Sequence, residues 1–278
     1  MSMPVQDIGY AKINLALHIR ARRADGYHLL ETLFAFAETG DVLTAVPAAD
    51  FTLEITGPFA AGLAEERDNL VLRAVRRLAK ANDIGTGLHL TLNKQLPIAA
   101  GIGGGSADAA AALRLAARIW GAENLRVPPE ALAADLGADV PACLAARTCF
   151  GTGIGEALTP VEGNLGVAGL PVLLVNPRLP CPTGPVFAAW DQVDLGPLTP
   201  ADWPTARNDL EAPALRLVPE IGAVLAALRA QPETRLARMS GSGATCFAVF
   251  DSLAKRDAAA ARLAKDAPGW WQLATQLR

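Results

Sequence analysis

The 278-residue sequence has few aromatic and charged residues and no surplus of basic residues. Aromatic residues make up 5% and charged residues 19% of the chain, whereas hydrophobic residues make up 51%, which is typical of a folded domain rather than a disordered chain. The formal net charge is −3 and the isoelectric point is about 5.7. This balance argues against a nucleic-acid partner, because such proteins normally carry a basic surface.

The four cysteines and three histidines are too scattered to suggest a metal site or a disulfide framework. No two cysteines have the CxxC spacing, and we expect them to be small buried residues of a reducing compartment. The N-terminus lacks a basic stretch followed by an apolar core, and the longest uncharged run, 163–177, is shorter than the roughly 18 residues of a membrane span. These observations predict a soluble, cytoplasmic protein without a membrane partner.

Common fingerprints of nucleotide binding and nucleophilic catalysis are also absent. A Walker loop needs Gly-Lys followed by Ser or Thr, and the chain contains no Gly-Lys pair. The dinucleotide pattern GxGxxG fails because Ser106 stands where its third glycine would be, and the nucleophile elbow GxSxG does not occur.

The densest glycine cluster lies in "PIAAGIGGGSADAAAAL" at 97–113, after a segment at 88–92 whose alternation predicts a strand. Ser106 can cap the helix that the alanines predict. Consecutive glycines let the main chain wrap round a ligand, and a helix start favours an anion. We therefore predict a phosphate-binding loop, with a flexible turn as the alternative. Two more glycine loops, at 151–156 and 240–244, are predicted hairpin turns, and the second is equally consistent with a nest of amides for a phosphate.

Other segments of the chain contain further candidate residues. Period-two alternation in "KINLALHI" predicts a half-buried strand with Lys12 and Asn14 on the face opposite the aliphatic residues. Asp68 can cap the helix that follows it. "PPEALAADLG" predicts a short helix ending at Gly137, which places Asp139 at a junction between helices.

Beyond about residue 160 the composition changes towards proline and glycine, and we place the boundary between two lobes, 1–160 and 161–278, there. We expect a strand in "PVLLV", a helix around 219–230, two strands flanking "SGSGA" and a helix at 253–265.

Several motifs in this chain resemble those of the GHMP kinases, a family of small-molecule kinases without a Walker loop. "AKINLALHI" is similar to the first family motif, "PIAAGIGGGSADAA" to the phosphate-binding motif and "RMSGSGATCFAVF" to the third. "RADGYH", "DNL", "LGADVPACL" and "NDLE" narrow the resemblance to the members that act on 4-diphosphocytidyl-2-C-methyl-D-erythritol in the non-mevalonate isoprenoid (MEP) pathway. The resemblance extends from about residue 10 to residue 250.

The resemblance implies an α+β, two-lobed GHMP kinase fold. Its N-terminal lobe is ribosomal-protein-like, its C-terminal lobe is a ferredoxin-like α/β sandwich, and ATP and the substrate are expected to meet between them. The implied reaction transfers the γ-phosphate of ATP, with Mg²⁺, to the 2-hydroxyl of the methylerythritol moiety. Three alternatives stay open: another GHMP kinase acting on homoserine, a mevalonate or a sugar, a nucleotide-binding module without catalysis, and an RNA-binding protein. Both a monomer and a homodimer are consistent with the sequence.

The family's catalytic positions correspond to Lys12 and Asp139. A carboxylate can accept the proton of a weakly nucleophilic tertiary alcohol, so the resemblance implies that Asp139 is the general base. An ammonium group beside it would keep the carboxylate ionised and stabilise charge on the transferred group, the role expected of Lys12. By residue type alone, a solvated lysine and a helix-capping aspartate are the alternatives.

Ligand-binding positions are implied in the same way. Those for ATP are Asn69, on the adenine side, and the loop residues Pro97, Ile98, Ala99, Ala100, Gly101, Ile102, Gly103, Gly104, Gly105, Ser106 and Ala107. The Ser106 hydroxyl is the candidate ligand for a phosphate or Mg²⁺, and Ala107 departs from the common "GGGSS" form of the loop, which removes one hydroxyl. Those for the substrate are Asn14, at its phosphate or hydroxyls, and Tyr27, His28, Thr183 and Phe187, at or near the cytosine ring, where aromatic faces would stack.

Overall fold

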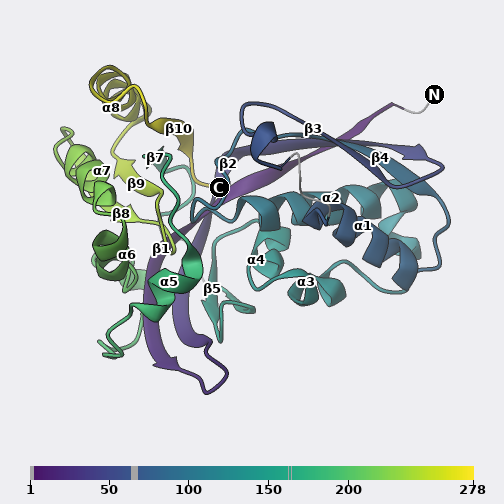
Figure 1. Cartoon of the computed structure of the whole chain (residues 1–278), viewed down its shortest axis with the longest axis horizontal. Coiled ribbons are helices and arrows are strands. Elements are labelled where there is room, and N and C mark those ends of the chain that lie inside the picture. Colours follow the sequence, from purple (N-terminus) through teal and green to yellow (C-terminus); the bar gives the residue numbers. More distant parts are fainter. Residues whose placement is uncertain (1–2, 64–67, 162, 164) are drawn as a thin grey trace. The chain divides into compact units, whose positions relative to one another are not determined.

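The computed structural model describes residues 3–63, 68–161, 163 and 165–278. Strands and helices build two sheets with helices packed on them, which confirms the α+β class (Figure 1). The strands are β1 (Val5–Arg22), β2 (His28–Ala48), β3 (Thr52–Thr56), β4 (Gly87–Asn93), β5 (Cys149–Thr152), β6 (Ala157–Pro160), β7 (Pro171–Asn176), β8 (Thr234–Met239), β9 (Cys246–Phe250) and β10 (Trp271–Gln276). The helices are α1 (Leu70–Ala81), α2 (Gly104–Trp120), α3 (Glu130–Leu136), α4 (Val140–Ala145), α5 (Thr183–Ala188), α6 (Glu211–Leu217), α7 (Glu220–Arg229) and α8 (Leu253–Asp266), with short 3-10 turns η1 (Ala60–Leu63), η2 (Ala122–Asn124) and η3 (Pro200–Asp202).

The first sheet has the order β3-β4-β2-β5-β6, with β1 paired to β2, and the second has the order β10-β7-β9-β8. β3 and β4 run parallel, whereas β2 pairs antiparallel with β4 through one part of its length and with β5 through another. The second sheet is antiparallel throughout. β2 thus carries two different neighbours along its 21 residues.

The chain packs into two compact units, and each is discontinuous in sequence. Unit 1 comprises Met1–Ala11, Thr39–Ile98 and Gly103–Ala146, and unit 2 comprises Lys12–Glu38, Ala99–Ile102 and Arg147–Arg278. β1 and β2 each contribute to both units, so the grouping follows no single boundary in the sequence. The division into two lobes at residue 160 stays a prediction.

In unit 1, helices α1 to α4 lie together on one face of β3 and β4 (Figure 1). α2 contacts α1 and α4, and its buried face is almost entirely alanine between Ala107 and Ala112. Side chains of this size let neighbouring helices approach closely at the density of a protein interior. At the first turn of α2, a Cβ on Gly9 of β1 would lie 3.1 Å from the Ala107 carbonyl carbon, so β1 passes close to the helix start.

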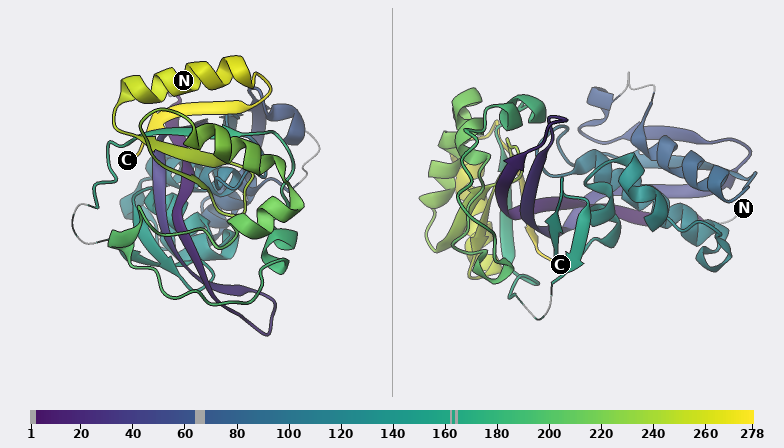
Figure 2. Two further views of the ribbon diagram at one scale, coloured as in Figure 1. Left: turned by 90° about the vertical axis from the view of Figure 1, so that its left-hand side faces the viewer. Right: turned by 90° about the horizontal axis from the view of Figure 1, so that it is seen from below.

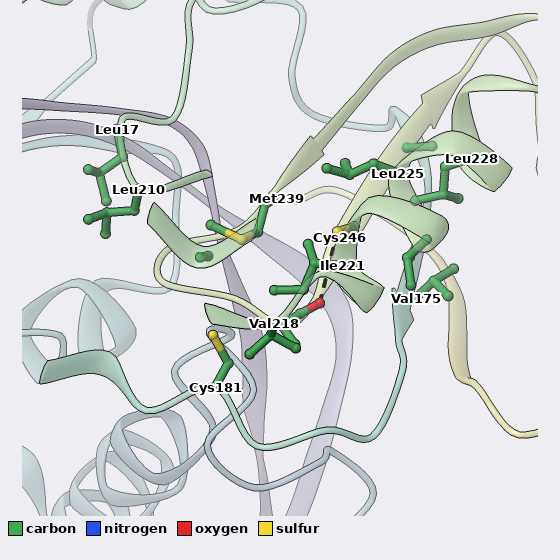
Figure 3. Packing of buried hydrophobic residues seen from close by; sticks show 14 of the residues in the cluster. Leu17, Val175, Cys181, Leu210, Val218, Ile221, Leu225, Leu228, Met239 and Cys246 are labelled. Carbon is green, nitrogen blue, oxygen red and sulfur yellow. Dashed lines mark hydrogen bonds between the residues drawn. The ribbon is translucent and has the colours of Figure 1, made fainter. Parts of the chain in front are cut away.

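In unit 2, α7 and α8 cover one face of the four-stranded sheet (Figure 2). Buried aliphatic and sulfur-containing residues from β1, β7, β8, β9 and the helices meet there, and Figure 3 labels Leu17, Val175, Cys181, Leu210, Val218, Ile221, Leu225, Leu228, Met239 and Cys246 among them. Burying each Leu or Ile side chain contributes about 1.5–3 kcal/mol. This core supports the β8–β9 hairpin, whose loop carries the third glycine motif.

The expected elements β4, β7, α3, α7, α8 and the β5–β6 and β8–β9 hairpins are confirmed. The predicted cap of α1 is wrong: Asn69, not Asp68, accepts the N–H of Val71, at 2.9 Å. The two residues are adjacent and both suit an N-cap, so only the backbone conformation decides between them. Within the described parts of the chain, no helix combines the length and the apolar character that crossing a membrane requires.

Candidate active site

Lys12 and Asn14 lie in β1, in unit 2, and both are buried. The prediction of a half-buried strand is wrong here, because residues 11–19 are buried on both faces. The Lys12 ammonium lies 3.2 Å from Asn14 Oδ1 and 4.7 Å from the ring centroid of Phe34. Asn14 Nδ2 donates to the Thr32 hydroxyl at 2.8 Å, so the polar face of β1 is covered by β2 rather than by solvent. A solvated lysine is therefore excluded for Lys12.

The first half of the glycine-rich segment, 99–102, packs against the β8–β9 loop within unit 2. Gly101 has φ +74°, and a Cβ there would lie 2.6 Å from the carbonyl oxygens of both Ser240 and Gly243. The N–H of Thr245 donates to Ala100 O at 3.2 Å. Only glycine fits at position 101, both because of this close approach and because of its left-handed conformation.

The Ser240 hydroxyl joins three segments that are far apart in the sequence. It accepts the N–H of Asn14 at 3.1 Å and donates to Gly101 O at 2.9 Å. The side-chain amide of Asn208, from the "NDLE" motif, donates at 2.8 Å to the carbonyls of Met239 and Gly241 on either side of Ser240. Hydrogen bonds within unit 2 thus connect the strand motif, the glycine-rich segment and the third glycine loop.

The second half of the segment begins α2 in unit 1. The helix starts at Gly104 after Gly103, which has φ +66°, so the prediction that Ser106 caps it is wrong and Ser106 lies in its first turn. A left-handed glycine turns the chain into the helix before the serine is reached. The first N–H groups of a helix have no partner within it. A Cβ on Gly105 would meet nothing within 4 Å, so the space beside this residue is open.

Three buried charged residues lie behind this helix start, also within unit 1. Lys94 Nζ is 2.5 Å from Asp41 Oδ2 and 2.6 Å from Asp108 Oδ2. A Cβ on Gly104 would lie 3.2 Å from the same ammonium nitrogen. Sequence reasoning missed this cluster, although Asp108 is the only charged residue between positions 96 and 113, which is the signal that could have revealed it.

Asp139 precedes α4 and makes no side-chain capping bond to it. Asp139 is thus the N-cap residue of α4 by position, and its expected role as general base stays a prediction. Asn69 caps α1 and is buried, and its expected place on the adenine side also stays a prediction. Both residues belong to unit 1.

The residues expected at the cytosine ring lie in unit 2. The His28 ring is 5.1 Å from that of Phe187, tilted by 40°, and 5.7 Å from that of Trp190, edge-on at 81°. Tyr27 is exposed, and the Thr183 hydroxyl lies 3.0 Å from that of Ser242. Burial, followed by the charge of Arg22, lowers the pKa of His28, so its imidazole is neutral at pH 7. Sequence reasoning missed Trp190, which is buried at the end of the segment that carries Phe187.

Comparison with known proteins identifies the family. Residues 69–147 match the model of the GHMP kinases N terminal domain, and residues 193–269 match that of the GHMP kinases C terminal domain. The chain is 56% identical over its whole length to the 4-diphosphocytidyl-2-C-methyl-D-erythritol kinase of Rhizorhabdus wittichii, covering 96% of that protein, and 54% identical to that of Sphingopyxis alaskensis, with both chains covered completely. The chain belongs to this family of GHMP kinases.

Solved structures agree with this family assignment. A crystal structure of a 4-(cytidine 5'-diphospho)-2C-methyl-D-erythritol kinase superposes with a TM-score of 0.84 at 34% identity, over 98% of this chain and 99% of that one. A homoserine kinase from Cytophaga hutchinsonii superposes with a TM-score of 0.70 at 15% identity, over 100% and 96%, and shows the shared fold alone. The expected GHMP kinase fold, with its N- and C-terminal domains, is confirmed.

A separate cavity of about 470 Å³ lies in unit 2 of this GHMP kinase, among α6, β8 and the segments that precede α6. Its lining includes Arg207, Arg216, Arg229 and Arg238. Each of the four already donates to a carboxylate or carbonyl oxygen. Because these guanidinium groups have partners and the predicted site residues are not among the residues lining the cavity, nothing in it points to a ligand.

Proposed function

We propose that this chain transfers the γ-phosphate of ATP to the 2-hydroxyl of 4-diphosphocytidyl-2-C-methyl-D-erythritol, giving the 2-phosphate and ADP, in the cytoplasm. The observation that carries the proposal is the junction at Ser240, which joins the GHMP motifs through Asn14 and Gly101. Relatives named for this activity align with the whole chain. We assign the chain to the MEP pathway on the same basis.

ATP would be held by main-chain groups of the segment 97–107. The positive φ at Gly101 and Gly103 and the open space beside Gly105 fit a triphosphate, which is bound by backbone amides in place of a Walker lysine. Among the described residues, no group of three or more His, Cys, Asp or Glu side chains is placed to hold a metal. We therefore assign Mg²⁺ mainly to the phosphates and water, with Ser106 as the candidate protein ligand. When bound, Mg²⁺ neutralises charge on the phosphates.

In the proposed chemical step, Asp139 accepts the proton of the substrate's 2-hydroxyl as that oxygen attacks the γ-phosphorus. Lys12 supplies positive charge that stabilises the transferred phosphoryl group. Asn14 orients Lys12 through its Oδ1 atom, and Thr32 in turn fixes Asn14. Phosphoryl transfer depends mainly on such positioning and electrostatics, and a lysine held by Asn14 suits this role.

The cytosine ring would contact the aromatic residues of unit 2. A neutral His28 has one ring nitrogen that donates and one that accepts, which suits the mixed donor and acceptor edge of cytosine. Phe187 and the exposed Tyr27 offer faces for stacking, and Thr183 lies in the same segment as Phe187.

The test is ADP release in a coupled assay with MgATP and four acceptors: the cytidyl substrate, homoserine, mevalonate and galactose. We expect turnover with the cytidyl substrate alone and a loss of about 10²–10⁴-fold in kcat for Asp139→Asn. Asp135→Asn is the matched control, because Asp135 is an exposed aspartate on α3. Turnover with another acceptor would overturn the substrate assignment, and ATP binding without any turnover would favour a non-catalytic nucleotide-binding module.

A further inference from the structure

The cluster of Lys94, Asp41 and Asp108 is the most heavily buried group of charges in the described parts of unit 1, and the proposed chemistry does not use it. The three side chains are 2%, 0% and 3% exposed. Asp41 comes from β2, Lys94 is the residue after β4, and Asp108 is the fifth residue of α2. One ammonium and two carboxylates leave a net charge of −1 unless a proton is also held.

The two carboxylates are not equivalent. Asp41 Oδ2 binds Lys94, and Asp41 Oδ1 accepts the N–H groups of Gln95 and Leu96 at 2.6 and 2.8 Å. Asp108 Oδ2 binds Lys94, but its Oδ1 is buried and has no hydrogen-bond partner. A buried carboxylate oxygen without a donor is costly when charged, so Asp108 is the residue that holds the proton.

The cluster is connected to the backbone on both sides of the glycine-rich segment. Asp41 fixes Gln95 and Leu96, which lead into the segment, and Asp108 belongs to the helix that leaves it. The ammonium of Lys94 lies directly behind Gly104, where a Cβ would be only 3.2 Å away. The charge state of the cluster therefore acts on the helix start whose amides fit a phosphate.

We propose that Lys94, Asp41 and Asp108 are positioning residues for the nucleotide triphosphate, and that a proton kept by Asp108 makes the cluster neutral and the helix start able to accept an anion. This inference rests on the proposed use of ATP. Loss of the proton places an uncompensated negative charge behind Gly104, which repels the phosphates and weakens ATP binding without altering the residues of the chemical step.

Electrostatics supports this assignment. Burial, opposed by the charge of Lys94 and reinforced by the charge and hydrogen bonding of Asp41, raises the pKa of Asp108 to about 8. Burial lowers the pKa of Lys94, but its interactions with Asp108 and Asp41 outweigh burial, so the net shift is upward and the ammonium stays charged. The charged groups that act on Asp108 are thus Lys94 and Asp41, while β1 presents the backbone of Gly9 to its Oδ1.

The test measures binding of the non-hydrolysable analogue AMP-PNP, with Mg²⁺, by titration calorimetry between pH 6.5 and 9. Each titration is run in two buffers of different ionisation enthalpy, which reports protons taken up on binding. For the wild type we expect Kd to rise about fivefold from pH 7 to pH 9 and a fraction of a proton to be taken up near pH 8. For Asp108→Asn we expect a Kd that changes little with pH and no such uptake.

Asp7→Asn is the matched control, because Asp7 is a half-buried aspartate of unit 1 that pairs with Arg114 and Arg118 instead of Lys94. It should keep the wild-type pH dependence. In turnover assays KM for ATP, but not kcat, should rise with pH in the wild type, a separation that a merely structural role would not produce. If Asp108→Asn fails to fold, the wild-type proton uptake alone decides.

Wild-type binding without proton uptake near pH 8, or an Asp108→Asn protein with an unchanged pH profile, would overturn the inference. These results do not depend on the acceptor. Failure to phosphorylate the cytidyl substrate would overturn the proposed function and leave the binding data standing, so the two failures are distinguishable.

Discussion

Residues 99–102 and 103–108 are neighbours in the sequence, yet different chemistry holds them. In unit 2, Gly101 and its neighbours are fixed by hydrogen bonds from neutral groups, the Ser240 hydroxyl and the Thr245 amide. In unit 1, the start of α2 is backed by the ions Lys94, Asp41 and Asp108. Hydrogen bonds between neutral groups hold a backbone in the same way at every pH. A buried cluster of one ammonium and two carboxylates changes its net charge with pH. The comparison indicates that residues 99–102, the neutral half, supply a fixed shape. Residues 103–108, the charged half, supply an electrostatic potential that changes with pH.

The largest expected effect comes from removing the cation of the charged half. Lys94→Met leaves two carboxylates buried without their ammonium, and we expect the free energy of unfolding to fall by about 3–5 kcal/mol. Urea denaturation followed by circular dichroism measures the change. A loss below 1 kcal/mol would mean that Lys94 is not the element that compensates Asp41 and Asp108.

The next effect concerns the neutral half. Gly101→Ala places a Cβ 2.6 Å from two backbone oxygens at φ +74°, and the backbone has no flexible side chain to move aside. Overpacking together with left-handed strain should cost about 2–4 kcal/mol of stability. Gly105→Ala is the control, because a Cβ there meets nothing within 4 Å, and it should be close to neutral in the same denaturation experiment. Equal losses in both variants would contradict the close packing of residues 99–102.

The two halves also differ in how much of each could be predicted from the sequence. The glycine pattern and the alternation around Lys12 and Asn14 are local signals in the sequence. Asn14 and Gly101, one residue from each signal, are the two partners of the Ser240 hydroxyl. The partners in the charged cluster are 14 and 53 residues from Lys94, and no local pattern connects positions so far apart. The sequence did not predict β2, because its 21 residues show no sustained alternation of apolar and polar side chains.

The start of α2 shows a second limit. Ser106 is a good N-cap by residue type, but the left-handed conformation of Gly103 begins the helix at Gly104. Glycine tolerates this conformation without requiring it, so the sequence permits both starts and only the packing of Gly9 and Lys94 against the first turn selects one. The roles of Lys12 and Asp139 rest on the family resemblance and stay predictions.

A smaller effect tests the neutral junction itself. Ser240→Ala removes the acceptor for the Asn14 N–H and the donor for Gly101 O, so a buried N–H and a partly buried carbonyl lose this partner. We expect a loss of about 2 kcal/mol, independent of pH, measured by urea denaturation at pH 6.5 and pH 8.5. Ser240→Thr, which keeps the hydroxyl, should recover part of the loss. A strongly pH-dependent loss in Ser240→Ala would contradict the neutral character of this half.

The smallest effect is the part of the pH dependence of stability that the charged half adds above pH 7. Asp108 holds its proton more tightly in the folded chain, where its pKa is about 8, than in the unfolded chain. Its contribution is therefore complete below pH 4, decreases progressively above pH 4, and is fully lost only above pH 8. Between pH 7 and 8.5 this amounts to about 1 kcal/mol of the free energy of unfolding. Asp108→Asn should remove that decline, whereas Ser240→Ala should retain it, in parallel urea denaturations at closely spaced pH values. A wild type whose stability is flat across this window would show that Asp108 keeps no proton, and the distinction between a fixed half and an adjustable half would then fail.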